Sequence, residues 1–144
     1  MPTPYESARL NLQLFEMRRE PVLREARMWF TLEFNPDSFA ELLSVAGGER
    51  EASIRMVLGY WEMAASLVTH GAIDSQAFLD AHGEIFLTFS KISPWLAEIR
   101  ATIGEPELCK HMERLVMSVP DAESVLTRRR TATRAAAAAR RAGQ

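Results

Sequence analysis

The chain contains very little cysteine and very little lysine. Cys109 is the only cysteine among 144 residues, so no disulfide can form within the chain, and a reducing compartment is the simplest interpretation. Lysine occurs twice against 15 arginines. We attribute that bias to the composition of the genome rather than to function.

Long hydrophobic runs are also missing. The longest uncharged stretch through the middle of the chain, Met63 to Ile73, is far shorter than the roughly 20 apolar residues that a membrane helix needs. The first residues, Met1 to Glu6, have neither the basic flank nor the apolar run of a signal peptide. We therefore expect a cytoplasmic protein without a spanning segment.

Nothing in the sequence predicts a β-strand, because alternating β-branched runs and Asn-Gly or Asp-Gly hairpin turns are missing. Helical spacing is present instead, most clearly from Glu49 to His70. There, apolar residues recur at i, i+3, i+4 and i+7 along one helix face: Ile54, Val57, Leu58, Trp61, Ala64, Ala65 and Val68. A second apolar row, Met56, Tyr60, Met63 and Leu67, runs beside it. Because only a narrow polar strip remains, we predict that this helix is the interior rod of a bundle, with Trp61 and Val68 buried.

Proline, glycine and capping residues divide the rest of the chain into further helices. Pro21 predicts a kink or a new helix start. Asp74 is expected to cap a helix that continues through Phe89 with Gly83 inside it. The other boundaries fall at Asn35-Pro36, Gly47-Gly48, Gly71, Ser93-Pro94, Gly104, Glu105-Pro106 and Pro120-Asp121. Together they predict an all-α, single-domain bundle of six to seven helices, occupying residues 1–127.

The net charge of −2 hides an asymmetry along the chain. Residues 1–127 carry 11 basic and 19 acidic groups, a balance of −8, and no acid follows Glu123. The remaining residues contain six arginines: Arg128, Arg129, Arg130, Arg134, Arg140 and Arg141. No large apolar residue after Leu126 anchors a helix to a core, and short isolated helices are marginal in water. Residues 128–144 are therefore predicted to form a frayed or disordered basic tail.

Two interpretations of this tail stay open. Its six arginines could contact the phosphates of nucleic acid or of anionic lipid. Alternatively, the tail is a solvated end whose charge offsets the acidic body. Because the body repels nucleic acid, binding to nucleic acid or to an anionic membrane is predicted only through the tail.

Between Arg55 and Arg100 the chain resembles a family of bacterial helical domains, domain-of-unknown-function family 4760. The resemblance rests on the segment from Ile54 to Glu62, on Ala64 and Ala65, on Gly71-Ala72-Ile73-Asp74, and on Ser93-Pro94-Trp95 followed by Ile99-Arg100. It covers about the middle third of the chain and implies an all-helical domain. Because the family has no established catalytic residues, the resemblance implies nothing about chemistry. Many relatives have an amino-terminal membrane segment, which this chain does not show.

Candidate metal ligands are few and poorly spaced. They are His70, His82, Cys109 and His111. Cys109 and His111 would lie about 200° apart around a helix, and the paired Glu-x-x-His motifs of di-iron bundles are missing, so we predict no metal and no cofactor. His82 lies between Phe78 and Ile85 on an apolar face. We expect it to be partly buried and hydrogen-bonded to a neighbouring helix, with a pH-sensitive contact as the functional alternative.

Glu62 and Arg55 lie two turns apart on the polar strip of the central helix. If other helices cover that strip, Glu62 must either find a cation, for which Arg100 is the candidate, or become neutral. We predict structural ion pairing among Glu62, Arg55 and Arg100 rather than a catalytic carboxylate.

Catalytic motifs are missing as well. The sequence contains no Gly-x-Ser-x-Gly and no glycine-rich phosphate loop, and Cys109 is expected to be a buried, inert thiol on the apolar face of its helix. We therefore expect a non-catalytic protein–protein interaction module with an unknown protein partner or a second copy of the chain. The residues expected on its docking surface are Leu10, Phe15, Met17, Met28 and Trp29. Binding to anionic surfaces through the arginine tail is the alternative.

Overall fold

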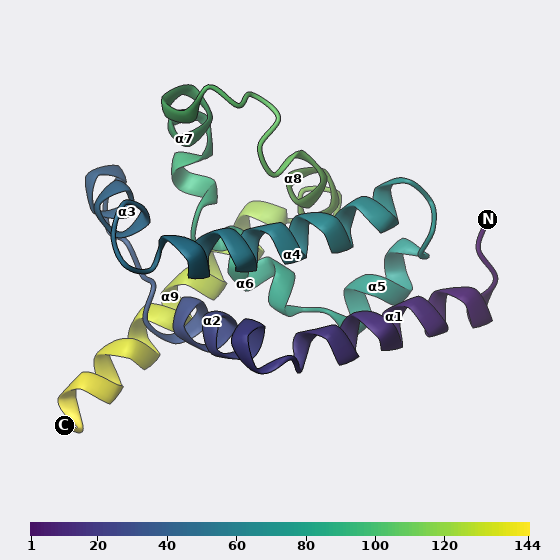
Figure 1. Ribbon diagram of the computed structural model, residues 1–144, viewed down its shortest axis with the longest axis horizontal. Coiled ribbons are helices and arrows are strands. Elements are labelled where there is room, and N and C mark those ends of the chain that lie inside the picture. Colours follow the sequence, from purple (N-terminus) through teal and green to yellow (C-terminus); the bar gives the residue numbers. More distant parts are fainter.

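The computed structural model describes all 144 residues. Every regular element is helical, which confirms the all-α prediction (Figure 1). The helices are α1 (Pro4–Arg18), α2 (Pro21–Leu32), α3 (Phe39–Ala46), α4 (Glu51–Thr69), α5 (Ser75–Ala81), α6 (Glu84–Ser90), the 3-10 turn η1 (Ser93–Trp95), α7 (Leu96–Ile103), α8 (Lys110–Val116) and α9 (Ala122–Ala142). The two termini lie at opposite ends of the molecule. None of the helices combines the length and the apolar character that a membrane crossing requires.

Helix α4 runs through the middle of the molecule, as its spacing predicts (Figure 1). It packs against α2, α3, α5 and α8, and both Trp61 and Val68 are buried. The interior-rod prediction is therefore confirmed. The second apolar row is covered only in part, because Tyr60 is buried whereas Met56 and Met63 are exposed.

Helices α1 and α2 follow one another along one edge of the molecule (Figure 1). After α1 ends, the Glu20 carboxylate accepts hydrogen bonds from the N–H groups of Val22 and Leu23, at 3.1 and 2.8 Å. This cap begins a new helix with Pro21 in its first turn, rather than kinking a longer one. Each of the two helices buries only one face against the core.

The predicted number of six to seven helices is too low, since the structure has nine α-helices. One reason is that the helix expected from Asp74 through Phe89 is in fact two helices. Asp74 caps α5 as predicted, accepting a hydrogen bond from the N–H of Ala77 at 2.9 Å. The chain then leaves helical geometry at His82 (φ −126°, ψ 53°). Because of this break, α6 takes its own direction, and Gly83 precedes that helix rather than lying inside one.

The left-handed glycine expected after the central helix is present. Gly71 follows α4 with φ 83°, and Gly104 caps α7 with φ 72°.

The helix expected to open at Glu105-Pro106 begins only at Lys110. Cys109 precedes it with φ 58°, so this residue is buried at the helix start instead of on a helical face.

The basic tail predicted to be frayed or disordered is instead the second half of α9. This helix runs without interruption from Ala122 to Ala142, and the predicted boundary between residues 127 and 128 falls inside it. The prediction failed because it considered only large apolar residues as anchors. The structure anchors the helix through Ala137, which is 4% exposed, and through arginine side chains.

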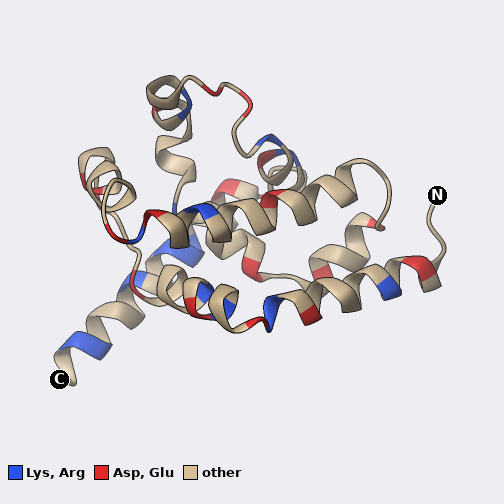
Figure 2. Cartoon of the chain, in the orientation of Figure 1, with Lys and Arg blue, Asp and Glu red and all other residues tan.

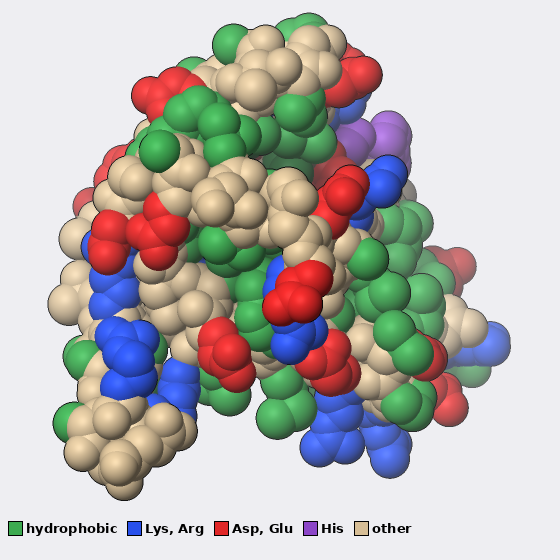
Figure 3. Space-filling model, turned by 60° about the vertical axis from the view of Figure 1, so that its left-hand side comes forward, with side chains coloured by type: hydrophobic (Ala, Val, Ile, Leu, Met, Phe, Trp, Pro, Cys, Tyr) green, Lys and Arg blue, Asp and Glu red, His purple; other side chains and the backbone are tan.

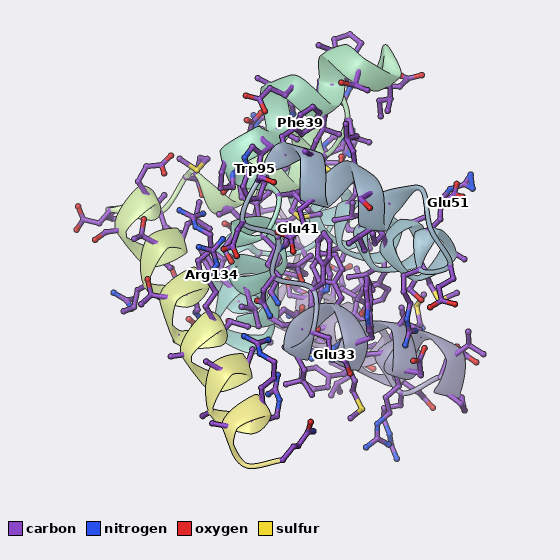
Figure 4. The ribbon with its side chains drawn as sticks, turned by 90° about the vertical axis from the view of Figure 1, so that its left-hand side faces the viewer. Glu33, Phe39, Glu41, Glu51, Trp95 and Arg134 are labelled. Carbon is purple, nitrogen blue, oxygen red and sulfur yellow. The ribbon has the colours of Figure 1, made fainter.

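Three of these arginines donate to main-chain carbonyl groups of the body. Arg130 donates to Ser90 at 2.9 Å, Arg134 donates to Pro36 at 2.7 Å, and Arg140 donates to Leu32. Arg134 also pairs with Asp37 at 3.3 Å. Figure 4 shows Arg134 extending from α9 toward the segment that joins α2 to α3.

Lys91, at the end of α6, completes this arrangement around the carboxyl end of α2. Its Nζ donates to the carbonyl groups of Phe30, Thr31 and Phe34 at 2.8, 2.6 and 2.8 Å. A helix leaves its last carbonyl groups unsatisfied, and its dipole favours cations there. Lys91 is 3% exposed and pairs with no carboxylate. Burial and the nearby positive charges of Arg140 and Arg134 lower the pKa of Lys91 to about 7.

Candidate docking surface on the first two helices

Exposed apolar side chains gather on the first two helices. Of the 13 large apolar side chains that are exposed, eight lie between Met1 and Leu32, so this region carries most of them. Among the residues expected on a docking surface, the exposed ones are Phe15, Met17 and Met28, and the half-buried ones are Leu10 and Trp29. Figure 3 shows apolar side chains beside Lys and Arg side chains along the lower edge of the molecule.

A groove of about 430 Å³ follows the outer face of α2. Its apolar wall consists of Pro21, Met28, Trp29 and Leu32, and its rim consists of Arg19, Arg24, Glu25, Glu33 and Arg50. An apolar centre with a charged rim is typical of surfaces that bind proteins.

Trp29 is held in a fixed position in this groove. The Arg50 guanidinium lies 4.9 Å from the Trp29 ring centroid and pairs with Glu25 at 2.9 Å. On its other side the indole contacts the rings of Phe30 and Phe34, with centroids 6.4 and 5.5 Å away. A fixed aromatic side chain loses little conformational entropy when a partner covers it.

A second hollow, of about 270 Å³, lies where α1 ends and α2 begins, and we call it the basic hollow. It is lined by Phe15, Arg18, Arg19, Arg24 and Arg27. Arg19 and Arg24 also line the groove, so the two depressions form one continuous surface. Figure 2 shows this gathering of basic residues at the junction of the two helices.

Arg18 and Arg27 share one carboxylate, which comes from α6. Glu84 Oε2 accepts hydrogen bonds from Nη2 of both arginines, at 2.8 and 2.6 Å, and Glu84 Oε1 accepts one from Arg27 Nε at 2.9 Å. The Arg18 guanidinium lies between the rings of Phe15 and Trp61, 4.6 and 5.3 Å from their centroids. One carboxylate facing two guanidinium groups leaves this cluster with an excess of one positive charge.

His82 lies behind Arg18 and is completely buried. Arg18 Nη1 is 3.4 Å from His82 Nδ1, and His82 Nε2 is 3.2 Å from Asn11 Oδ1. Because arginine can only donate, Nδ1 accepts and Nε2 carries the proton, so the ring is neutral. Burial, and then the positive charge of Arg18, lower the pKa of His82 to about 4. The expected hydrogen bond to a neighbouring helix is confirmed, and the burial is complete rather than partial.

This histidine is expected to make the protein less stable in mild acid. An unfolded imidazole takes up a proton near pH 6.5, whereas the folded protein resists protonation until about pH 4. Between these values the unfolded state binds more protons, so stability falls as pH falls. We expect His82 to remove about 2 kcal/mol from the free energy of unfolding between pH 7 and pH 5. Denaturant titrations at both pH values compare wild type with His82→Gln. If the free energy of unfolding falls equally in the two proteins between pH 7 and pH 5, His82 is not the cause of the acid sensitivity.

Glu62, predicted to pair with a cation, is satisfied by backbone groups instead. Helix α8 covers it, and its carboxylate accepts hydrogen bonds from the N–H groups of His111 and Met112 at 3.2 and 2.7 Å. The positive end of the α8 dipole favours a carboxylate at this place. Glu62 therefore joins α4 to α8 without the help of Arg100.

Arg100 and Arg55 form ion pairs of their own. Arg100 donates to the Leu108 carbonyl from Nε and Nη2 and pairs with Glu113 at 3.1 Å. Arg55 pairs with Glu51, one turn earlier on α4, at 3.4 Å, and both side chains are exposed. The structure thus brings none of the three predicted residues together as a pair.

Of the residues considered as metal ligands, His70 and His111 lie close together and His82 lies elsewhere. The rings of His70 and His111 are 5.0 Å apart, and His111 Nδ1 is 2.6 Å from Thr69 Oγ1, whereas His82 packs against α1. No group of three or more His, Cys, Asp or Glu side chains is arranged to hold a metal ion. Burial raises the pKa of the Cys109 thiol to about 12, which makes it a poor nucleophile at neutral pH.

The six arginines of the carboxyl-terminal segment differ in how available they are. Those bonded to the body are Arg130, Arg134 and Arg140. Arg128 and Arg141 are exposed and have no ion-pair partner, and Arg129 is half-buried. Fewer guanidinium groups of α9 are free to contact an external anion than the sequence alone indicates.

Sequence reasoning missed the basic hollow. The available signal was the pair Arg18-Arg19 followed by Arg24 and Arg27, but acidic residues are interspersed among them. The counter-charge, Glu84, lies 57 residues beyond Arg27, and no local pattern connects the two.

Comparison with protein families gives a match over most of the chain. The family described as "Domain of unknown function (DUF4760)" matches residues 5–119, a span that takes in nearly all of α1 and all of α2 to α8 and stops before α9. The match extends well beyond the middle third on which the resemblance in the sequence rested. Neither a curated protein nor a solved structure matches the chain.

Proposed function

Because the chain belongs to the DUF4760 family, whose description assigns no function, we propose one from the geometry of this chain. It is a non-catalytic helical module that binds another protein through the groove on α2 and the basic hollow beside it. The observation that carries this proposal is the concentration of exposed apolar side chains on α1 and α2. Exposed apolar side chains that gather in one region, with a groove among them, are typical of an interaction site.

The composition of the groove supports a protein as the partner. Tryptophan, methionine and arginine are enriched in protein interfaces, and a fixed aromatic residue near the centre often dominates the binding energy. Trp29 and Met28 occupy that position here, with Arg19 and Arg24 at the rim.

The partner segment that fits is an amphipathic helix with acidic residues beside its apolar face. Apolar side chains spaced at i, i+3 or i+4, and i+7 would contact Met28, Trp29 and Leu32. Arg19 and Arg24 have no ion-pair partner in the structure, so acidic side chains of the partner would complement them. We commit to a different protein as the occupant, and a second copy of this chain is the alternative that the test separates.

The proposal includes the absence of catalysis and a reducing, cytoplasmic setting. Cys109 is buried and difficult to ionise, and the Glu62 carboxylate is occupied by α8 amide groups. A single thiol that stays buried and unpaired fits a cytoplasmic protein.

Selection from a library of helical peptides that varies both charge and apolar spacing tests the proposal. The enriched peptides are expected to combine an apolar stripe with acidic residues. Met28→Glu is expected to weaken their binding by about tenfold or more, because it places a carboxylate in the apolar wall of the groove. Fluorescence anisotropy with a labelled peptide measures this change.

Met117→Glu is the matched control, because Met117 is also exposed but lies outside the first two helices. Peptides that bind wild type and Met28→Glu equally would contradict the proposal. Sedimentation of the unliganded protein shows whether wild type forms a dimer that Met28→Glu dissociates, in which case a second copy is the occupant.

A further inference from the structure

The basic hollow has a property that does not depend on a protein partner in the groove. Its inner wall consists of two guanidinium groups that are already held in position. The Arg18 and Arg27 side chains are 13% and 14% exposed, and Glu84 fixes both through three hydrogen bonds. Two aromatic rings enclose Arg18 as well. Groups fixed in advance lose little entropy when they bind a ligand.

The outer wall of the hollow carries two guanidinium groups that form no ion pair. They belong to Arg19 and Arg24, although acidic residues lie near both in the sequence. The Glu20 carboxylate bonds to the N–H groups of Val22 and Leu23 instead. Four guanidinium groups, set against the Glu84 carboxylate and the Glu20 carboxylate at the start of α2, leave an excess of about two positive charges around one depression.

We propose that this basic hollow binds a phosphate group, either as the free ion or as a monoester. Arg18 and Arg27 already donate to groups of the protein, so the guanidinium groups of Arg19 and Arg24 supply the parallel hydrogen bonds by which arginine recognises phosphate. A dianion matches the excess charge better than a monoanion. The volume of about 270 Å³ leaves room for a small tetrahedral anion between the two walls. The site combines Arg18 and Arg19 at the end of α1 with Arg24 and Arg27 on α2.

Titration of the full-length protein with inorganic phosphate, at constant ionic strength in sodium chloride, tests this site. In NMR spectra, the Nε–Hε signals of the arginines in the hollow are expected to shift as phosphate is added and to stop shifting once the site is full. Isothermal titration calorimetry gives the affinity. Arg24→Gln and Arg19→Gln are each expected to weaken phosphate binding at least about tenfold, because each removes one of the two guanidinium groups of the outer wall. Both side chains are exposed, so neither substitution disturbs the core.

Arg114→Gln is the control of equal charge, because Arg114 is exposed on α8 and forms no ion pair. It is expected to bind phosphate as wild type does. The proposal is overturned if the shifts rise linearly without saturation, or if all three variants behave alike. Met28→Ala shortens the apolar wall of the groove without placing a charge one turn from Arg24, so it is expected to keep phosphate binding while it weakens peptide binding. Failure of the docking function and failure of this site can therefore be told apart.

Two further titrations identify the source of the phosphate group. A peptide with one phosphoserine and the same peptide with serine are compared with the free ion. Tighter binding of the phosphopeptide assigns the site to a modified side chain, and equal or tighter binding of the free ion assigns it to inorganic phosphate. Equal binding of the serine peptide and the phosphopeptide, together with no saturable response to the free ion, overturns the proposal.

Discussion

Replacing Glu84 with glutamine is expected to lower the free energy of unfolding by about 3–5 kcal/mol, because a buried ion pair then loses one partner. Glu84 is the only carboxylate that pairs with Arg18 and Arg27, and all three side chains are less than a fifth exposed. Glutamine has nearly the same shape, so the loss reports charge rather than packing. Its amide would also turn a donor toward guanidinium groups that can only donate.

Chemical denaturation at pH 7 measures this loss, and Glu107→Gln is the matched control. Glu107 pairs with Lys110 on the surface, so its replacement is expected to leave the denaturant midpoint of unfolding unchanged. A loss of less than about 1 kcal/mol in Glu84→Gln, the value typical of a surface pair, would mean that water already solvates Arg18 and Arg27. The inner wall of the basic hollow would then not be fixed in advance.

Replacing Lys91 with methionine is expected to cost about 3 kcal/mol, because several buried acceptors then lose their donor. Nζ of this lysine bonds to the carbonyl groups of Phe30, Thr31 and Phe34 and lies 3.2 Å from Asn35 Oδ1. Methionine fills similar space without donating. The carboxyl end of α2 would therefore lose most of the hydrogen bonds that satisfy it.

The chain offers an internal control, because Lys110 is its only other lysine and lies on the surface. Lys110→Met is expected to leave stability unchanged. The measurement is made at pH 6, below the lowered pKa of about 7 that Lys91 has in the folded protein. At this pH Lys91 is protonated in most folded molecules and in the unfolded chain. Faster hydrogen exchange at the end of α2 would accompany the loss. Equal stabilities of the two lysine variants would contradict the structural role of Lys91.

Cations bonded to main-chain carbonyl groups recur throughout this structure. They are Arg27, Lys91, Arg100, Arg130, Arg134 and Arg140. A fold of many short helices leaves many carbonyl ends to satisfy, and the guanidinium group has five donors for that purpose. The bias toward arginine, which composition alone attributes to the genome, therefore has a structural use here.

The sequence by itself determined the helical class, the central position of α4 and several helix boundaries. Apolar spacing placed Trp61 in the core, and local chemistry placed the cap at Asp74 and the left-handed residue at Gly71. The resemblance in the middle of the chain also identified the family that matches residues 5–119. These features could be predicted because helix periodicity and capping depend on residues within a few positions of one another.

Only the tertiary structure decided which partners the charged side chains take. The arginines after residue 127 anchor α9 because carbonyl groups at the ends of α2 and α6 and in the segment after α2 come within their reach, which no spacing along the chain reveals. Glu62 meets the start of α8 rather than Arg100 for the same reason. Long charged side chains bond to whatever acceptor or donor the packing of distant helices brings near, so the groove and the basic hollow could not be read from local pattern.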